Sequence, residues 1–161
     1  MLYNPLGDWL SWFMSHGALR CACETDTPLN IILVTSFASN VARMESVFYC
    51  AEKTGRQISL VGRSMHRIFK AARECGYLKN VIDPIDPRDV KNISREKIIY
   101  LCTGSQGEPM GAMMRIANYN HPDVFIERGD AVIFSSKIIP GNEKKLYKLH
   151  NQLVDRKSTR L

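Results

Sequence analysis

Four short apolar runs constrain the fold of this chain more than any other feature of its sequence. They lie within residues 31–35, 58–61, 97–102 and 130–134. When a parallel sheet is buried on both faces, its strands have continuous apolar sequences, in which apolar and polar residues do not alternate. Between the first two runs, apolar residues recur at helical spacing, at Val41, Met44, Val47, Phe48 and Ala51. This alternation predicts an α/β domain, with a mostly parallel sheet of at least four strands and helices on both faces.

The length and composition suit one domain of this kind. The chain has 161 residues, of which 45% are hydrophobic and 24% are charged, as is usual for a globular protein. We expect residues 31–154 to form the domain, residues 1–30 to be a divergent N-terminal segment and residues 155–161 to be a divergent C-terminal tail. No apolar run approaches the length that spans a bilayer, so we expect no membrane partner.

The five cysteines predict reduced thiols rather than disulfides. Cys50, Cys75 and Cys102 have apolar neighbours and are expected to be small buried hydrophobic residues. Cys21 and Cys23 lie near His16, but the second half of a zinc ligand set is missing. We therefore expect no metal site in this chain and a cytoplasmic location.

The segment TGSQGEPM, residues 103–110, follows the third apolar run and precedes a helical pattern of methionines. Gly104 and Gly107 allow backbone angles that other residues avoid, and Pro109 suits the first turn of a helix. In an open α/β sheet, loops at the carboxyl ends of strands form the ligand crevice. The segment is therefore predicted to be a polar strand-to-helix loop that faces a ligand.

This loop resembles the ribonuclease J family of the metallo-β-lactamase superfamily. The same is true of four other blocks, which come in the family's order: TSFASNVAR at 35–43, LVGRSM at 60–65, GDAVIFSS at 129–136 and IPGNE at 139–143. The resemblance covers residues 31–154 and corresponds to the β-CASP domain. It implies a bacterial RNA-degrading hydrolase, a nuclease whose catalytic zinc ions are bound by a metallo-β-lactamase domain.

The resemblance also implies an RNA-binding role for the loops, because the β-CASP domain of the family faces the metal site across a channel. Their hydroxyls, amides and backbone N–H groups are usual donors to phosphate and sugar. Alternatively, Asn40 and Glu108 only cap helices. The residues expected to contact RNA are Ser36, Ser39, Asn40, Arg43, Ser105, Gln106, Gly107, Glu108, Ser135 and Ser136.

No catalytic residue is assigned. The four histidines, His16, His66, His121 and His150, have no pairwise spacing typical of metal ligands, and none matches a family ligand. Ser105, His121 and Asp130 could be named as a triad, but no nucleophile-elbow motif supports it. We expect this chain alone to lack ribonuclease activity and to need no cofactor, although zinc is expected in the full-length family enzyme.

The net charge of +6 suits a polyanionic partner. Seven Lys or Arg residues against three Asp or Glu residues lie in residues 40–75, and six against two lie in residues 141–161. Arg63, Arg67 and Lys70 fall near one another on a predicted helix. They either attract phosphate or form an ordinary solvated face.

The leading hypothesis is a truncated β-CASP domain that binds and positions single-stranded RNA without cutting it, while another chain could supply the metallo-β-lactamase domain. The first alternative is an inactive structural or interaction remnant. The second is a small enzyme with a nucleotide ligand, although the chain has neither a G-x-G-x-x-G nor a Walker loop.

Overall fold

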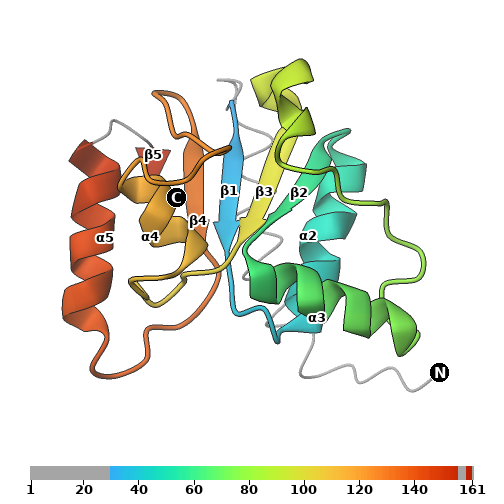
Figure 1. The fold of residues 1–161 in the computed structure, drawn as a ribbon, viewed down its shortest axis with the longest axis horizontal. Coiled ribbons are helices and arrows are strands. Elements are labelled where there is room, and N and C mark those ends of the chain that lie inside the picture. The colour runs from blue at the N-terminus through green and yellow to red at the C-terminus, as the bar shows by residue number, and fades with distance from the viewer. Residues whose placement is uncertain (1–29, 156–158, 161) are drawn as a thin grey trace.

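The computed structural model describes residues 30–155 and 159–160, and its central element is a parallel sheet. The strands lie in the order β2-β3-β1-β4-β5, and every neighbouring pair is parallel (Figure 1). The predicted α/β fold is confirmed. The strands are β1 (Ile32–Thr35), β2 (Gln57–Val61), β3 (Ile98–Cys102), β4 (Ala131–Phe134) and β5 (Thr159–Arg160).

The central strand β1 explains why the apolar runs are continuous. It pairs with β3 on one side, Ile32 opposite Ile99, and with β4 on the other, Ile32 opposite Ala131. All four of its residues are buried. Because helices cover both faces of the sheet, the side chains on both sides of β1 are removed from water.

Two pairs of helices cover the two faces (Figure 1). The helices α2 (Val41–Lys53) and α3 (Arg63–Glu74) pack on the face formed by Ile32 and Val34. The helices α4 (Ala112–Ala117) and α5 (Glu143–Asp155) pack on the face formed by Ile31 and Leu33. The domain therefore has two hydrophobic cores, one on each side of a shared sheet.

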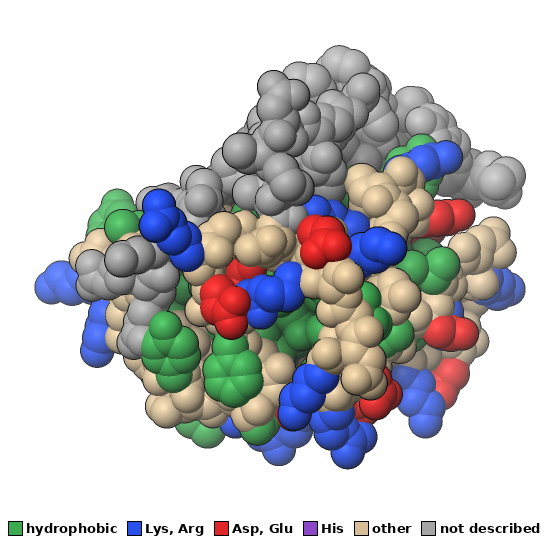
Figure 2. All heavy atoms as spheres, turned by 90° about the horizontal axis from the view of Figure 1, so that it is seen from above, with side chains coloured by type: hydrophobic (Ala, Val, Ile, Leu, Met, Phe, Trp, Pro, Cys, Tyr) green, Lys and Arg blue, Asp and Glu red, His purple; other side chains and the backbone are tan. Residues whose placement is uncertain are grey.

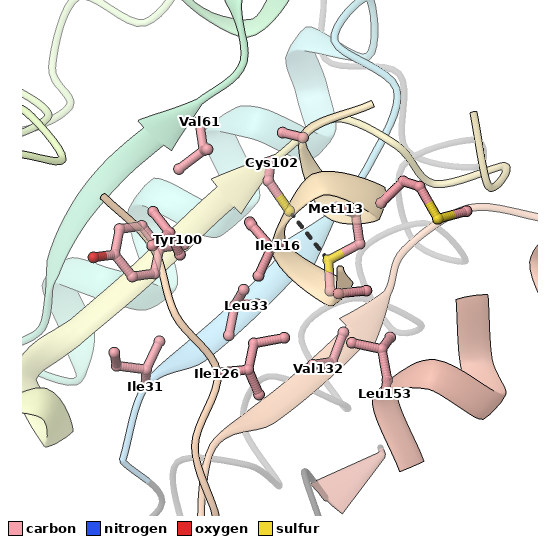
Figure 3. Packing of buried hydrophobic residues seen from close by; sticks show 14 of the residues in the cluster. Ile31, Leu33, Val61, Tyr100, Cys102, Met113, Ile116, Ile126, Val132 and Leu153 are labelled. Atoms are coloured by element: carbon pink, nitrogen blue, oxygen red, sulfur yellow. Dashed lines mark hydrogen bonds between the residues drawn. The ribbon is translucent and has the colours of Figure 1, made fainter. Parts of the chain in front are cut away.

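Figure 3 shows the second core, where side chains of the sheet meet those of α4 and α5. The Cys102 thiol lies 3.7 Å from the Met113 sulfur. Complete burial raises the pKa of the Cys102 thiol to about 12, so it remains a neutral core group. Met113 and Met114 thus fill the core, whereas Met110, which precedes the helix, is 86% exposed.

The connection from α3 to β3 runs along the free edge of β2. Ile85 forms a parallel bridge with Ser59, whose hydroxyl donates a hydrogen bond of 2.9 Å to the Ile85 carbonyl. Two short 3-10 helices follow, Asp89–Asn92 and Arg95–Lys97. The edge of β2 is thereby partly covered.

One predicted helix start was wrong. Pro109 was expected in the first turn of a helix, yet α4 begins only at Ala112. The sequence favours proline in a first turn, but packing of the preceding loop decides where the helix begins. The helix α3 is capped by Gly62, and Ser64 lies inside it.

One burial prediction also needs correction. Cys75 is exposed because it follows the last residue of α3, where the chain turns into solvent. In α5, Leu146, Leu149 and Leu153 are buried, whereas Val154 is 56% exposed. The predictions for Cys21, Cys23 and His16 fall outside the described residues. Within the described part of the chain, no helix is both long and apolar enough to cross a bilayer.

Candidate nucleic-acid interface

The loops that follow β1, β3 and β4 meet at the carboxyl edge of the sheet. The Ser36 amide donates to the Cys102 carbonyl at 3.2 Å, and the Ser135 amide donates to the Thr35 carbonyl at 2.9 Å. Loops 36–40 and 103–108 therefore share one edge of the sheet. The parallel register brings them together because all strands end on the same side.

Gln106 joins the loop after β3 to the loop after β4. Its side-chain amide donates to the Ser136 hydroxyl at 3.2 Å and to the Lys137 carbonyl at 2.8 Å, while its side-chain oxygen accepts from the Ile139 amide at 2.8 Å. Only 3% of Gln106 is exposed. Its hydrogen bonds are therefore used within the protein, and its role is to hold the two loops together.

The glycines of the TGSQGEPM loop are required by close packing. A Cβ at Gly107 would lie 2.8 Å from the Lys145 backbone carbon, and the residue has a φ of +70°. A Cβ on Gly111, just beyond the segment, would lie 2.7 Å from the Gly104 Cα. The loop is folded onto itself and onto α5, which only residues without a side chain permit.

The ten residues expected to contact RNA all lie in or beside these loops, but they differ in exposure. The exposed ones are Ser39, Asn40 and Glu108; the half-buried ones are Arg43, Ser135 and Ser136; the buried ones are Ser36, Ser105, Gln106 and Gly107. In the described structure, the buried side chains point into the protein. A double Ser105→Ala and Gln106→Ala change is accordingly expected to lower stability.

The alternative reading of Asn40 as a helix cap is correct. Its side-chain oxygen accepts a hydrogen bond from the backbone N–H of Arg43 at 3.0 Å, at the start of α2. Glu108 caps no helix, but its carboxylate accepts a hydrogen bond from the backbone N–H of Gln106 at 2.9 Å and stabilises the loop. Capping uses the Asn40 oxygen and leaves its side-chain N–H groups at an exposed position.

Beside these loops, at the ends of β2 and β3, lies a cavity of about 880 Å³. Its wall includes Arg63 and Arg67 from α3, Arg115 from α4, and His121 with Asp123 from the turn after α4. The sequence left the role of the α3 arginines open, and it suggested His121 only as a member of an unsupported triad. The i, i+4 spacing of Arg63 and Arg67 was the available signal.

His121 has a defined tautomer in this wall. Its Nδ1 accepts from the Asp123 amide at 3.3 Å and from the Val124 amide at 3.2 Å. A nitrogen that accepts carries no proton, so the neutral ring has its proton on Nε2. Burial, and secondarily the charge of Arg115, lowers the pKa of His121.

The opposite edge of the sheet is electrostatically mixed. The strand arrows of Figure 1 point downward, so Figure 2, seen from above, shows the amino-end face, where acidic and basic side chains lie next to one another. Asp130 is buried here and accepts from the Ile31 amide at 3.0 Å, the Glu127 amide at 2.8 Å and the Arg95 guanidinium. Since Asp130 precedes β4 and Ser105 follows β3, these two residues lie at opposite edges and form no triad.

Zinc, which the resemblance implies for the complete family enzyme, does not fit the residues that the structure describes. Among them, no group of three or more His, Cys, Asp or Glu side chains is arranged to hold a metal ion. Structural and catalytic zinc sites use at least three such ligands.

Comparison with known proteins gives a consistent set of relatives. The family model "Ribonuclease J, beta-CASP domain" matches residues 30–153. The chain is 44% identical over 125 residues to Ribonuclease J 1 of Streptococcus pyogenes, a match covering 77% of this chain and 22% of that protein. It is 39% identical over 122 residues to Ribonuclease J of Sinorhizobium meliloti (76% and 22% covered) and 41% identical over 122 residues to that of Thermus thermophilus (76% and 21%). The matched region thus spans about a fifth of the length of these relatives.

Proposed function

Because this chain belongs to the ribonuclease J family and matches its β-CASP domain, we propose that the carboxyl edge of its sheet binds and positions single-stranded RNA. The observation that carries the proposal is the joining of the loops after β1, β3 and β4 into one surface by backbone hydrogen bonds and by Gln106. Binding, not hydrolysis, is assigned to these residues, and zinc is given no role in this chain. The proposed location is cytoplasmic.

This surface carries donors suited to an RNA backbone. Ser39, Asn40 and Lys137 are exposed, and Arg43 is half-buried on the first turn of α2. Hydroxyl, amide, ammonium and guanidinium groups are the side chains that contact phosphate and sugar most often. Three buried residues support this surface and are not proposed to touch RNA: Ser105, Gln106 and Gly107.

Titration of labelled single-stranded RNA at several salt concentrations tests the proposal. Lys137→Gln and Arg43→Gln should each weaken binding of all RNA sequences about equally, because phosphate contacts carry no base information. Each should also reduce the salt dependence, by about 0.7 in the slope of log affinity against log salt for each lost contact with a single strand.

Lys97→Gln is the matched control. Lys97 is exposed and directly precedes β3, so it lies at the amino edge of the sheet. The substitution removes the same charge from the other side of the domain and should leave the slope unchanged. If Lys97→Gln and Lys137→Gln weakened RNA binding equally, net charge alone would explain the binding, and the proposed surface would be refuted.

An interaction module is the second candidate, and exposed apolar side chains at the same edge favour it. Phe37 follows β1 and is 36% exposed, while Ile138 and Ile139 follow β4 and are 42% and 47% exposed. Apolar side chains in such positions are typical of protein contacts. The partner proposed for this role is a metallo-β-lactamase domain carried by another chain. Docking of that kind should persist at salt concentrations that abolish RNA binding.

A further inference from the structure

The cavity beside β2 and β3 has the size and the lining of a small-ligand site. Its volume of about 880 Å³ falls within the range of pockets that enclose compact organic ligands, roughly 300–1,000 Å³. Three arginines against one aspartate give its wall a formal excess of two positive charges. Such an excess favours an anionic ligand.

The two arginines of α3 are available to an anion. Arg63 and Arg67 are exposed and lie one helical turn apart, so their side chains project in similar directions. Within the described part of the chain, neither guanidinium forms an ion pair or a hydrogen bond. Lys70, on the same helix, is not part of the cavity wall and pairs with Glu74.

The start of α3 adds neutral donors to the same wall. Gly62, Arg63 and Ser64 all line the cavity, and the cap at Gly62 provides no side-chain acceptor for the first amides of the helix. A Cβ at Gly62 would lie 2.6 Å from the Thr103 hydroxyl, so glycine is needed to bring the helix start this close to the end of β3. Free amides at a helix start supplement arginines in holding phosphate.

The lining of the cavity also includes groups that suit the remainder of a nucleotide. Pro87, Met110 and Pro122 contribute apolar surface, and Met110 is 86% exposed and therefore free to adapt to a flat ring. The occupied Nδ1 of His121 leaves Nε2–H as the donor of that ring. The Asp123 carboxylate can accept a hydrogen bond from a ribose hydroxyl.

We propose that this cavity binds one ribonucleoside monophosphate unit, with its phosphate between Arg63 and Arg67 and its base against Met110 and Pro122. The choice of a ribonucleotide over another organic phosphate rests on the proposed RNA function. The cavity itself is separate from the surface formed by the loops after β1 and β4. A free mononucleotide and a nucleotide within an RNA strand share the chemistry that the cavity recognises.

Calorimetric titration of the 161-residue chain with AMP tests the proposal. AMP should bind more tightly than inorganic phosphate or adenosine, because inorganic phosphate lacks the base and adenosine lacks the phosphate. Arg67→Gln should weaken AMP binding about tenfold or more, as expected for the loss of a hydrogen bond between charged groups. Lys70→Gln, which removes the same charge from the same helix outside the cavity, should change it less than about twofold. Equal effects of the two variants, or no AMP binding by the wild type, would overturn the proposal.

Labelled RNA, measured in the same buffer, separates this inference from the proposed function. RNA binding without AMP binding would refute the cavity and leave the loop surface intact. AMP binding without RNA binding would refute the loop surface and leave the cavity intact. If both bind, loss of RNA affinity in Arg67→Gln identifies the ligand as a nucleotide of the strand. Unchanged RNA affinity identifies it as a free mononucleotide.

Discussion

At the scale of single residues, the polar side chains of the carboxyl edge are of two kinds. Some are buried and hold the loops together, and others are exposed to solvent. Gln106 and Ser105 are buried, whereas Ser39 and Asn40 are exposed. Gln106 satisfies one carbonyl, one hydroxyl and one amide of the neighbouring loop. A buried amide with all these partners specifies one arrangement of two loops, which an apolar residue could not do.

Gln106→Ala is therefore expected to lower the free energy of unfolding by about 1–3 kcal/mol, since its partners lose their hydrogen bonds. Gln57→Ala, the same substitution at an exposed position that starts β2, should cost less than about 0.5 kcal/mol. Urea denaturation followed by circular dichroism measures both. Equal stability of the two variants would show that Gln106 does not hold the loops.

His121 predicts a dependence of stability on pH. Its folded-state pKa is lowered, chiefly by burial and then by Arg115, so the unfolded chain binds the proton more readily. The stability that His121 contributes is present above its ordinary pKa of about 6.5 and is lost as the pH falls through the folded-state pKa. Protonation of Nδ1 would also remove the acceptor for the amides of Asp123 and Val124.

His121→Asn supplies the comparison, because an asparagine oxygen can accept the same amides but does not titrate. As the pH is lowered below about 6.5, the free energy of unfolding should fall more for the wild type than for His121→Asn. Denaturation curves at a series of pH values measure it. A difference that is independent of pH would contradict the buried, neutral imidazole.

At the scale of elements, the loop between β3 and α4 is a packing unit as well as a connection. It contacts α5 through Gly107 and the start of α4 through Gly104, whose Cβ would lie 2.9 Å from the Met113 Cβ. Backbone-to-backbone contact of this kind fixes α5 relative to the sheet. The position of the exposed loop after β4 is thereby coupled to the loop after β3.

Gly107→Ala should be considerably more destabilising than Gly55→Ala. Both glycines have a left-handed φ, +70° and +63°, so alanine pays a similar conformational cost of about 1 kcal/mol at each. A Cβ at Gly55 meets nothing within 4 Å, whereas one at Gly107 meets the backbone of α5. We expect Gly107→Ala to cost about 1–3 kcal/mol more, as measured by thermal or urea unfolding. Similar costs at both positions would show that the loop does not pack tightly on α5.

At the scale of the whole molecule, one sheet separates two cores that depend on the same strands. Ile32 belongs to the core beneath α2 and α3, and its neighbour Leu33 belongs to the core beneath α4 and α5. Both are completely buried. Since β1 pairs with both β3 and β4, neither core can open without disturbing the strand that they share.

Ile32→Ala and Leu33→Ala are therefore expected to destabilise the same cooperative transition, each by about 2–5 kcal/mol. Urea unfolding followed by a tertiary and a secondary structural signal should remain a single step with an unchanged m-value. A biphasic transition in which each substitution shifts a different phase would show that the two faces unfold independently.

The sequence by itself determined the architecture and the family. Continuous apolar runs require burial on both faces of a sheet, and this requirement does not depend on how the helices are eventually placed. The shared edge of the loops followed too, because parallel strands all end on one side. Five ordered sequence blocks were enough to identify the ribonuclease J family, and the matched family model confirms it.

Only the tertiary structure decided what each polar side chain does. Gln106 and Asn40 are equally polar in the sequence, but one is buried between two loops and the other caps α2 at the surface. Cys75 has apolar neighbours in the sequence yet is exposed, because it lies just after the last residue of α3. The cavity that unites Arg63 and Arg67 with Arg115 and His121 joins residues separated by about half of the domain. Burial and proximity are properties of the packed chain, so local pattern and propensity could not predict them.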